Sequence, residues 1–231
     1  MIFSWLELGL GKILVDKQPN PSVGALFFPP LCFIAGDSDS ECAIDLIWEI
    51  PPQNIMIPPD DAWAFLIQKE WGDQTHIQHR TRMSPKLLSI EHIRRLRHAL
   101  PSGFGLYEIK LQTMLDSDSF FWEGMLPFFG SFENFIQNGF GYCIKSERKV
   151  VSVAYTAFPY THDFEVQVTT LNSPKYRRKG LATIVSSALI EDGLSKGVTP
   201  QWDAANSASV QLALKLGYSD PDPYDVYYRL E

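Results

Sequence analysis

The pattern of apolar and polar positions is clearest in the second half of the chain, where it predicts both helices and strands. Apolar residues recur at the i, i+3, i+4 spacing of an amphipathic helix over residues 180–194. Another helix is expected over residues 206–216, because Asn206 is a good N-cap and Gly217 can end a helix in a left-handed turn. Shorter apolar runs predict strands at residues 105–110, 140–145, 149–158, 164–171, 201–204 and 225–230, and residues 116–138 predict one or two helices with a break at Pro127.

The first half of the chain mixes short apolar runs with two helix candidates. Residues 24–28, 31–35, 43–50 and 77–81 are typical of strands, whereas residues 59–71 and 89–99 favour helices. Turn-forming residues at 100–103 separate this half from the next. The sequence therefore predicts an α/β (α+β) fold, with a smaller α+β domain at residues 1–103 and a domain at 104–231 whose mixed β-sheet is flanked by helices.

Composition indicates a folded globular protein that is not built to bind nucleic acid. Of 231 residues, 45% are hydrophobic, which is enough to fill a core. The net charge of −7 argues against non-specific nucleic-acid binding, which needs a basic surface. The one basic cluster lies in the expected helix 89–99 and is interpreted as a solvated helix face; it comprises Arg94, Arg95, Arg97 and His98.

The cysteines and the apolar segments indicate the cellular compartment in which the protein is expected. Cys32, Cys42 and Cys143 are odd in number and form no close pair, so a reducing cytoplasm is expected rather than a disulfide framework or a zinc site. The first residues carry Glu7 and no early Lys or Arg, which argues against a signal peptide. The longest apolar run, residues 23–36, contains two prolines and is shorter than the ~18 residues of a membrane span, so no membrane partner is expected.

The segment between the expected strand 164–171 and the expected helix 180–194 carries a candidate phosphate-binding loop. A glycine at a strand-to-helix turn leaves backbone N–H groups free at the positive end of the helix dipole, where they can bind a pyrophosphate. Flanking cationic side chains would add charge for a diphosphate or a ribose phosphate. The residues proposed for this loop are Arg177, Arg178, Lys179, Gly180, Leu181, Ala182 and Thr183.

Two motifs in this region resemble the GNAT superfamily of N-acetyltransferases. Arg177-x-x-Gly180-x-Ala182 resembles its acyl-CoA pyrophosphate loop, and Asn206-x-x-Ser209 with the following Lys-Leu-Gly-Tyr resembles its helix beside the pantetheine arm. The resemblance covers about residues 104–231 and looks most like the subgroup with the zwittermicin-resistance acetyltransferases. It implies a mostly antiparallel sheet, acetyl-CoA as co-substrate, no metal, and direct transfer of acetyl to the amine of a small molecule. The acceptor and the oligomeric state stay open, and a homodimer is possible.

The resemblance also assigns roles on the strand 164–171. Its backbone N–H groups around Val168, Thr169 and Thr170 would contact the thioester carbonyl and the pantetheine amide, and its splay from the neighbouring strand would create the slot. Glu165 is the candidate general base, because it is the one carboxylate on its face of the strand. Asp163 and His162 are alternatives, and an exposed strand carboxylate without a catalytic role fits Glu165 equally well.

The expected general acid is missing. Many members of the superfamily place a tyrosine seven residues after the helix asparagine, and here that residue is Ala213. Tyr218 is the candidate substitute only if geometry allows, since a residue after a helix-ending glycine usually packs. The tyrosines of the last expected strand are further alternatives, namely Tyr224, Tyr227 and Tyr228. Solvent can also protonate the leaving thiolate, because its thiol has a pKa of ~8.5.

Weaker signals leave other interpretations in view. Gly9-x-Gly11-Lys12 lacks the spacing of a phosphate loop, and His76 with His79 has no suitably spaced third metal ligand. The aromatic residues between 120 and 135 fit either an acceptor pocket or a packed core, with the core favoured. The function classes that compete with an acetyltransferase are a catalytically silent acyl-CoA-binding or sensing module and a purely structural interaction protein.

Overall fold

The computed structural model describes residues 2–97 and 100–230, and its contacts divide the chain into two compact units. The large unit is Thr81–Asp222, and the small unit combines Ile2–Arg80 with Pro223–Glu231. The end of the last strand, from Pro223 on, thus belongs to the same unit as the N-terminal residues. The expected boundary at residue 103 lies inside the large unit, and whether either piece folds alone stays a prediction. His98 and Ala99 lie outside the described residues.

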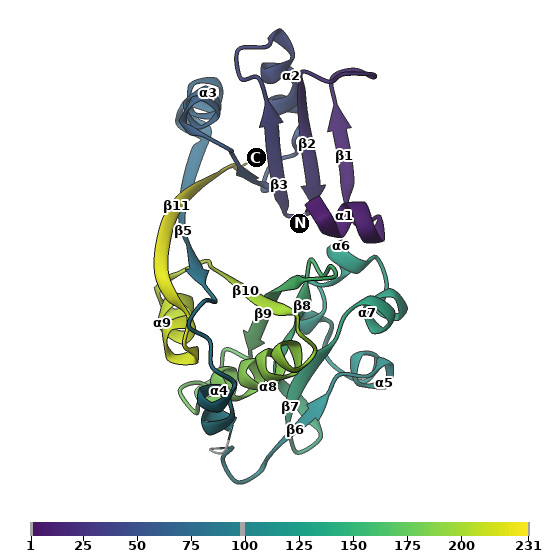
Figure 1. Cartoon of the computed structure of the whole chain (residues 1–231), viewed down its shortest axis with the longest axis vertical. Helices are drawn as coiled ribbons and strands as arrows, with labels where there is room; N and C mark the ends of the chain where they lie inside the picture. The colour runs from purple at the N-terminus through teal and green to yellow at the C-terminus, as the bar shows by residue number, and fades with distance from the viewer. Residues whose placement is uncertain (1, 98–99, 231) are drawn as a thin grey trace. The chain divides into compact units, whose positions relative to one another are not determined.

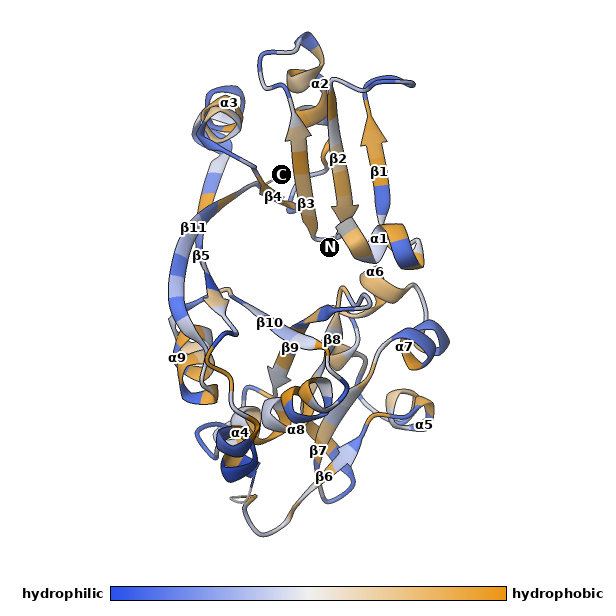
Figure 2. Ribbon diagram, viewed as in Figure 1, coloured by the Kyte–Doolittle hydropathy of each residue, from blue (hydrophilic) through white to orange (hydrophobic). Residues whose placement is uncertain are grey.

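The small unit is a sheet covered by helices (Figure 1), with its core where the apolar strands lie in Figure 2. Its strands are ordered β1-β2-β3-β4-β11, and the pairs are antiparallel except for β3 with β4. Tyr227 of β11 is paired with Met56 of β4, and both are buried in this core. The elements are α1 (Ile2–Leu8), β1 (Lys12–Val15), β2 (Val23–Phe28), β3 (Leu31–Gly36), α2 (Glu41–Glu49), β4 (Ile55–Ile57), α3 (Asp61–Trp71), the 3-10 helix η1 (Gly72–Gln74) and the end of β11 (Ser219–Arg229).

The expected strand at residues 43–50 is wrong, because this segment is helix α2. Ser40 caps the helix by accepting a hydrogen bond from the Cys42 N–H at 3.4 Å. Ala43, Leu46 and Ile47 are buried. Their i, i+3, i+4 spacing is that of a helix face, which a short apolar run does not distinguish from a strand.

The large unit holds a mixed, mostly antiparallel sheet flanked by helices, as predicted. Its strand order is β5-β10-β9-β8-β7-β6, and only β9 and β10 run parallel. The strands are the end of β5 (Thr75–Ser84), β6 (Phe104–Glu108), β7 (Gly141–Ser146), β8 (Lys149–Ala157), β9 (Asp163–Thr170) and β10 (Thr199–Ala204). The helices are α4 (Ile90–Arg97), α5 (Leu111–Leu115), the 3-10 helix η2 (Ser119–Phe121), α6 (Leu126–Phe129), α7 (Phe132–Asn138), α8 (Leu181–Ser195) and α9 (Ser207–Leu216).

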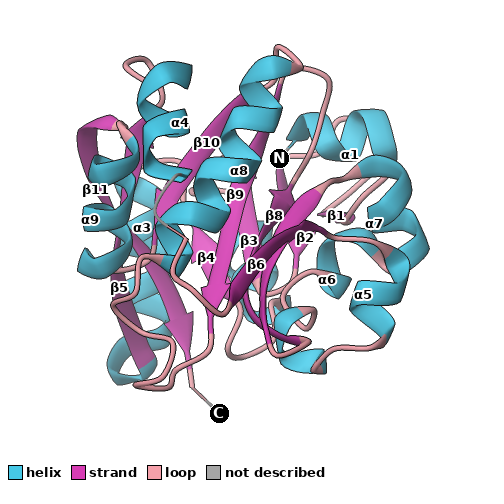
Figure 3. Ribbon diagram, turned by 90° about the horizontal axis from the view of Figure 1, so that it is seen from below, coloured by secondary structure: helices cyan, strands magenta, loops and turns pink. Residues whose placement is uncertain are grey.

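Helices α4, α8 and α9 cover one face of this sheet, and α4 and α8 lie in front of β9 and β10 in Figure 3. Phe164 and Val166 of β9 pack with α8 in one core cluster. The expected apolar stripe of α8 lies in that cluster, but its opposite side is buried as well, including Thr183 and Ser187. The amphipathic pattern therefore placed the helix correctly and underestimated how completely it is enclosed.

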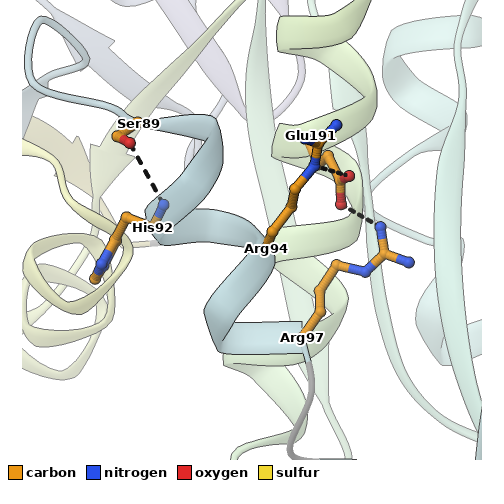
Figure 4. Close-up of polar contacts among 5 residues, drawn as sticks. All are labelled: Ser89, His92, Arg94, Arg97 and Glu191. Atoms are coloured by element: carbon orange, nitrogen blue, oxygen red, sulfur yellow. Dashed lines mark hydrogen bonds and ion pairs between the residues drawn. The ribbon is translucent and has the colours of Figure 1, made fainter.

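Charged residues of α4 bind α8. Glu191 accepts hydrogen bonds from Arg94 Nε at 2.9 Å and from Arg97 Nη1 (Figure 4). These bonds hold the pKa of the Glu191 carboxyl below its usual range, although its partial burial opposes them. Two of the basic residues interpreted as a solvated face are thus half-exposed and ion-paired.

The aromatic segment before β7 is core. Phe121, Trp122, Phe128, Phe129 and Phe135 are buried, while Phe120 is 48% exposed. The rings of Trp122 and Phe135 contact Tyr155 of β8, with centroids 6.4 and 5.9 Å apart. The side chain of Tyr155 points to the opposite face from Ala154, which packs with α8. The core interpretation is confirmed for these five residues, and α5 to α7 cover the second face.

Candidate active site

The turn from β9 into α8 presents unpaired backbone donors. Gly180 is the N-cap of α8, with a left-handed φ of 77°. A Cβ at Gly180 would meet no atom within 4 Å, so the space beside it is open. The Ile184 N–H makes the first intrahelical bond, to the Gly180 carbonyl. The N–H groups of Leu181, Ala182 and Thr183 therefore point out of the helix at the positive end of its dipole, as a phosphate site requires.

Cationic side chains precede this turn. Arg177 Nη1 donates to Asn172 Oδ1 at 2.8 Å, and the Arg177 N–H donates to the Ser173 carbonyl at 2.9 Å. Arg178 has a left-handed φ of 56°, and both Arg178 and Lys179 are exposed. Two hydrogen bonds therefore tie Arg177 to the start of the loop, and all three cations are exposed next to the helix N-terminus.

Strands β9 and β10 separate part-way along their length. Their pairs run from Thr199 with Asp163 to Gln201 with Glu165. Beyond this point β9 continues beside β8 as far as Thr170, whereas β10 pairs with β5 from Trp202 onward. The two parallel strands therefore form a fork that opens toward the same end of β9 as the turn into α8.

Backbone donors of β9 point into this fork. The Leu171 N–H donates to the Val151 carbonyl of β8, and the register places these residues opposite each other. In an antiparallel pair the residues facing the partner alternate, so odd-numbered residues of β9 bond to β8. The Val166 N–H faces the Gln201 carbonyl within the last pair of the β9–β10 ladder, and the N–H groups of Val168 and Thr170 face the fork beyond it. The Thr169 backbone belongs to the ladder with β8.

The motif on α9 lies at the start of its helix. Asn206 is the N-cap, and its Oδ1 accepts the Ser209 N–H at 3.0 Å. Ser209 Oγ accepts a hydrogen bond from Trp202 Nε1 at 3.1 Å, which ties α9 to β10. Both residues thus stabilise the helix start, and the Asn206 NH₂ group is the donor that remains for a ligand.

Comparison with known proteins identifies the family. The sequence profile of the GNAT acetyltransferase family matches residues 1–227. The chain belongs to this family. It is 26% identical over 231 residues to the uncharacterised N-acetyltransferase YdfB of Bacillus subtilis, with 94% of this chain and 85% of that protein covered.

Solved GNAT structures have the same fold. A GCN5-related N-acetyltransferase-like protein from Streptococcus suis aligns with a TM-score of 0.84 at 28% identity, over 99% of this chain and 93% of that one. A GCN5-related N-acetyltransferase from Kribbella flavida aligns with a TM-score of 0.57 at 13% identity, over 94% and 89% of the two chains, and supports the fold alone. As a GNAT family member, the chain is an acyltransferase, and the expected mixed sheet is confirmed.

In this GNAT protein, Glu165 lies at the fork. Its Oε1 accepts a hydrogen bond from the Asp203 backbone N–H of β10 at 2.5 Å. Glu165, Gln167 and Thr169 alternate onto the face of β9 that is opposite α8. Asp163, on the same face, accepts bonds from Tyr160 Oη at 2.7 Å and Gln201 Nε2 at 3.3 Å. The sequence did not single out Asp203, although its place on an expected strand beside the candidate base was the available signal.

Tyr218 is buried in the core that α8 shares with the sheet. Its hydroxyl donates to the Pro200 carbonyl at 3.0 Å, and its ring lies 5.4 Å from that of Trp202. Burial, and then the negative charge of Glu165, raise the Tyr218 pKa well above its usual value. Ala213, which stands at the usual tyrosine position, is buried in the same cluster and offers no hydroxyl.

The other candidates are spread over the two units. His162 is exposed in the turn before β9, in the large unit. Tyr227 packs in the core of the small unit, and Tyr228 stacks on His76 with ring centroids 5.4 Å apart. His79 Nδ1 lies 2.6 Å from Asp225 Oδ1. Within residues 2–97 and 100–230, no group of three or more His, Cys, Asp or Glu is placed to hold a metal, and no helix is long and apolar enough to cross a membrane.

Proposed function

We propose that the protein is an acetyl-CoA-dependent N-acetyltransferase that transfers acetyl to the amine of a small molecule by direct attack on the thioester. The observation that carries this proposal is the fork between β9 and β10, which opens at the end of β9 next to the N-terminus of α8. The N–H groups of residues 181–183 would bind the pyrophosphate, with Arg177, Arg178 and Lys179 adding charge. The N–H groups of Val168 and Thr170 would hold the pantetheine arm and the thioester carbonyl.

The fit of this site to acetyl-CoA rests on the open space beside its donors. A Cβ at Gly180 would meet no atom within 4 Å, so nothing blocks the approach of a phosphate there. Backbone N–H groups aimed at the thioester oxygen would stabilise the negative charge that develops there during attack. Thr169 would contribute through its side chain alone, and Asn206 and Ser209 would fix the α9 N-terminus beside the arm.

Glu165 is the proposed general base. Its side chain lies on the face opposite α8, where the acceptor would approach, and Asp163 and Asp203 alternate onto that same face. Carboxylates there would attract a protonated amine and then accept its proton, directly or through one water. The Tyr218 hydroxyl is committed to Pro200, which supports a packing role and leaves protonation of the thiolate to solvent.

Several finer assignments belong to the same proposal. The small unit would govern acceptor choice, because both cofactor motifs lie in the large unit. We also infer that the protein belongs to the subgroup with the zwittermicin-resistance acetyltransferases, so amine-bearing antibiotics join polyamines and amino acids as test acceptors. A cytoplasmic location is supported by three free cysteines, Cys32, Cys42 and Cys143.

Release of free coenzyme A from acetyl-CoA, measured with this panel of amines, tests the proposal. Acetyl transfer to at least one amine is the expected result. Tight binding of acetyl-CoA without turnover for any acceptor would favour the silent acyl-CoA-binding module, and absence of binding would favour a structural interaction protein.

A further inference from the structure

The backbone of β10 changes partner at Asp203. The Thr199 N–H donates to the His162 carbonyl. Parallel strands repeat such bonds every two residues, so the ladder would continue from Gln201 to Phe164 and from Asp203 to Val166. The register between β9 and β10 ends at Gln201 with Glu165, one bond before Asp203 would reach Val166.

The Glu165 side chain receives the bond that the ladder would otherwise make. The Asp203 N–H donates to Glu165 Oε1 rather than to a backbone carbonyl of β9. A buried backbone N–H has to find an acceptor, and a carboxylate is a stronger acceptor than a carbonyl. The Glu165 carboxylate therefore gives the Asp203 N–H an acceptor at the point where β10 leaves β9.

We propose that Glu165 is a wedge that holds the fork between β9 and β10 open, as a positioning role separate from its proposed role as a base. Because the Asp203 N–H donates to Glu165 Oε1, β10 does not pair with Val166, and the N–H groups of Val168 and Thr170 stay available for a ligand. The consequence for acetyl-CoA rests on the proposed function, whereas the bond itself is a property of the protein alone.

Two substitutions separate the wedge from the base. Glu165→Gln keeps an acceptor oxygen at the same reach and cannot take a proton. Glu165→Leu has a similar volume and no acceptor. The wedge therefore survives in the glutamine variant and is lost in the leucine variant, whereas a base is lost in both.

Amide hydrogen exchange of the full-length protein without ligand measures the wedge directly. In Glu165→Leu we expect the Asp203 amide to exchange at least about tenfold faster than in the wild type, and in Glu165→Gln within about twofold of it. The Trp202 amide is the internal control, because alternation turns it toward β5 and away from Glu165. Acetyl-CoA affinity, measured by calorimetry, should weaken about tenfold in the leucine variant and stay near wild type in the glutamine variant.

If the Asp203 amide keeps wild-type protection in Glu165→Leu, or loses it in Glu165→Gln, the wedge proposal is overturned. If the leucine variant does not fold, Glu165→Met replaces it. In that case the scalar coupling across the hydrogen bond, from the Asp203 nitrogen to the Glu165 carboxyl carbon, is also measured in the wild type, and its absence overturns the proposal. If no form binds acetyl-CoA, the proposed function fails, while the exchange rates still decide the wedge.

Discussion

Replacing Glu165 by glutamine separates the shape of this side chain from its ability to take a proton. An amine acceptor is mostly protonated at neutral pH, and a positioned base contributes about 10²–10⁴-fold to rate. We expect kcat of Glu165→Gln near pH 7 to fall at least about 10²-fold and to recover in part at high pH, where the amine deprotonates itself. Acetyl-CoA affinity should stay nearly unchanged, because the wedge persists.

Asp163→Asn is the matched control for this measurement. Asp163 lies two residues earlier on the same face of β9, and its carboxylate is engaged by Tyr160 and Gln201. We expect its kcat to fall far less than that of Glu165→Gln. If kcat fell more in Asp163→Asn than in Glu165→Gln, the role of general base would belong to Asp163.

Tyr218 gives a prediction on pH and stability. Because burial raises its pKa in the folded protein, the unfolded chain loses the phenolic proton first as pH rises. The contribution of Tyr218 to the free energy of unfolding is therefore fully present below pH ~10. Above that pH it decreases by up to about 1.4 kcal/mol per pH unit. Denaturant unfolding between pH 9 and 11 should show a shallower loss of stability in Tyr218→Phe than in the wild type.

The same variant tests the general acid. Tyr218→Phe should cost about 1 kcal/mol of stability at neutral pH through the unpaired Pro200 carbonyl, and change turnover little. A severe loss of turnover would contradict the packing role and make the hydroxyl a proton donor to the thiolate. An unchanged stability profile between pH 9 and 11 would contradict the prediction on the Tyr218 pKa.

At the scale of elements, Gly180 and Gly197 make a matched pair at the two ends of α8. Both have a left-handed φ, 77° and 73°, and a Cβ at either would meet no atom within 4 Å. Aspartate therefore introduces the same strain and the same charge at each. Only at Gly180 would the carboxylate lie against the proposed pyrophosphate site.

We expect acetyl-CoA to raise the stability of the wild type and of Gly197→Asp, but not that of Gly180→Asp. Ligand at a hundredfold over its dissociation constant adds about 2.7 kcal/mol to the free energy of unfolding, which a thermal-shift titration detects. An equal shift in all three proteins would remove the cofactor-site assignment from this turn.

The elements show where sequence reasoning was sufficient and where it was not. The caps at Asn206 and Gly217 are local signals, and helix α9 lies where they predicted. Residues 43–50 carried spacing compatible with a helix, and length alone did not decide between helix and strand. The fork was expected from the family resemblance. The contact between Glu165 and Asp203 at the fork joins residues 38 apart in the sequence and depends on the register between their strands, which no local pattern encodes.

At the scale of the whole molecule, the chain leaves the small unit and returns to it. Met83 of β5 is paired with Trp202 of β10, and Ile93 of α4 is fully buried in the core around α8. Both residues precede the boundary that turn-forming residues at 100–103 suggested. A fragment of residues 102–231 lacks these contacts, and it retains Tyr227 of β11 without its partner Met56.

We therefore expect the fragment Thr81–Asp222 to fold and bind acetyl-CoA, and the fragment 102–231 to do neither. The first keeps every strand from the end of β5 to β10 together with α4, α8 and α9, and removes the end of β11 with the rest of the small unit. Thermal unfolding shows whether each fragment folds cooperatively, and calorimetry measures whether it binds acetyl-CoA. If fragment 102–231 folds and binds, the domain boundary lies near residue 103 instead.

Acceptor turnover by Thr81–Asp222 should be impaired, since the small unit is proposed to govern acceptor choice. Normal turnover by this fragment would assign the small unit another role.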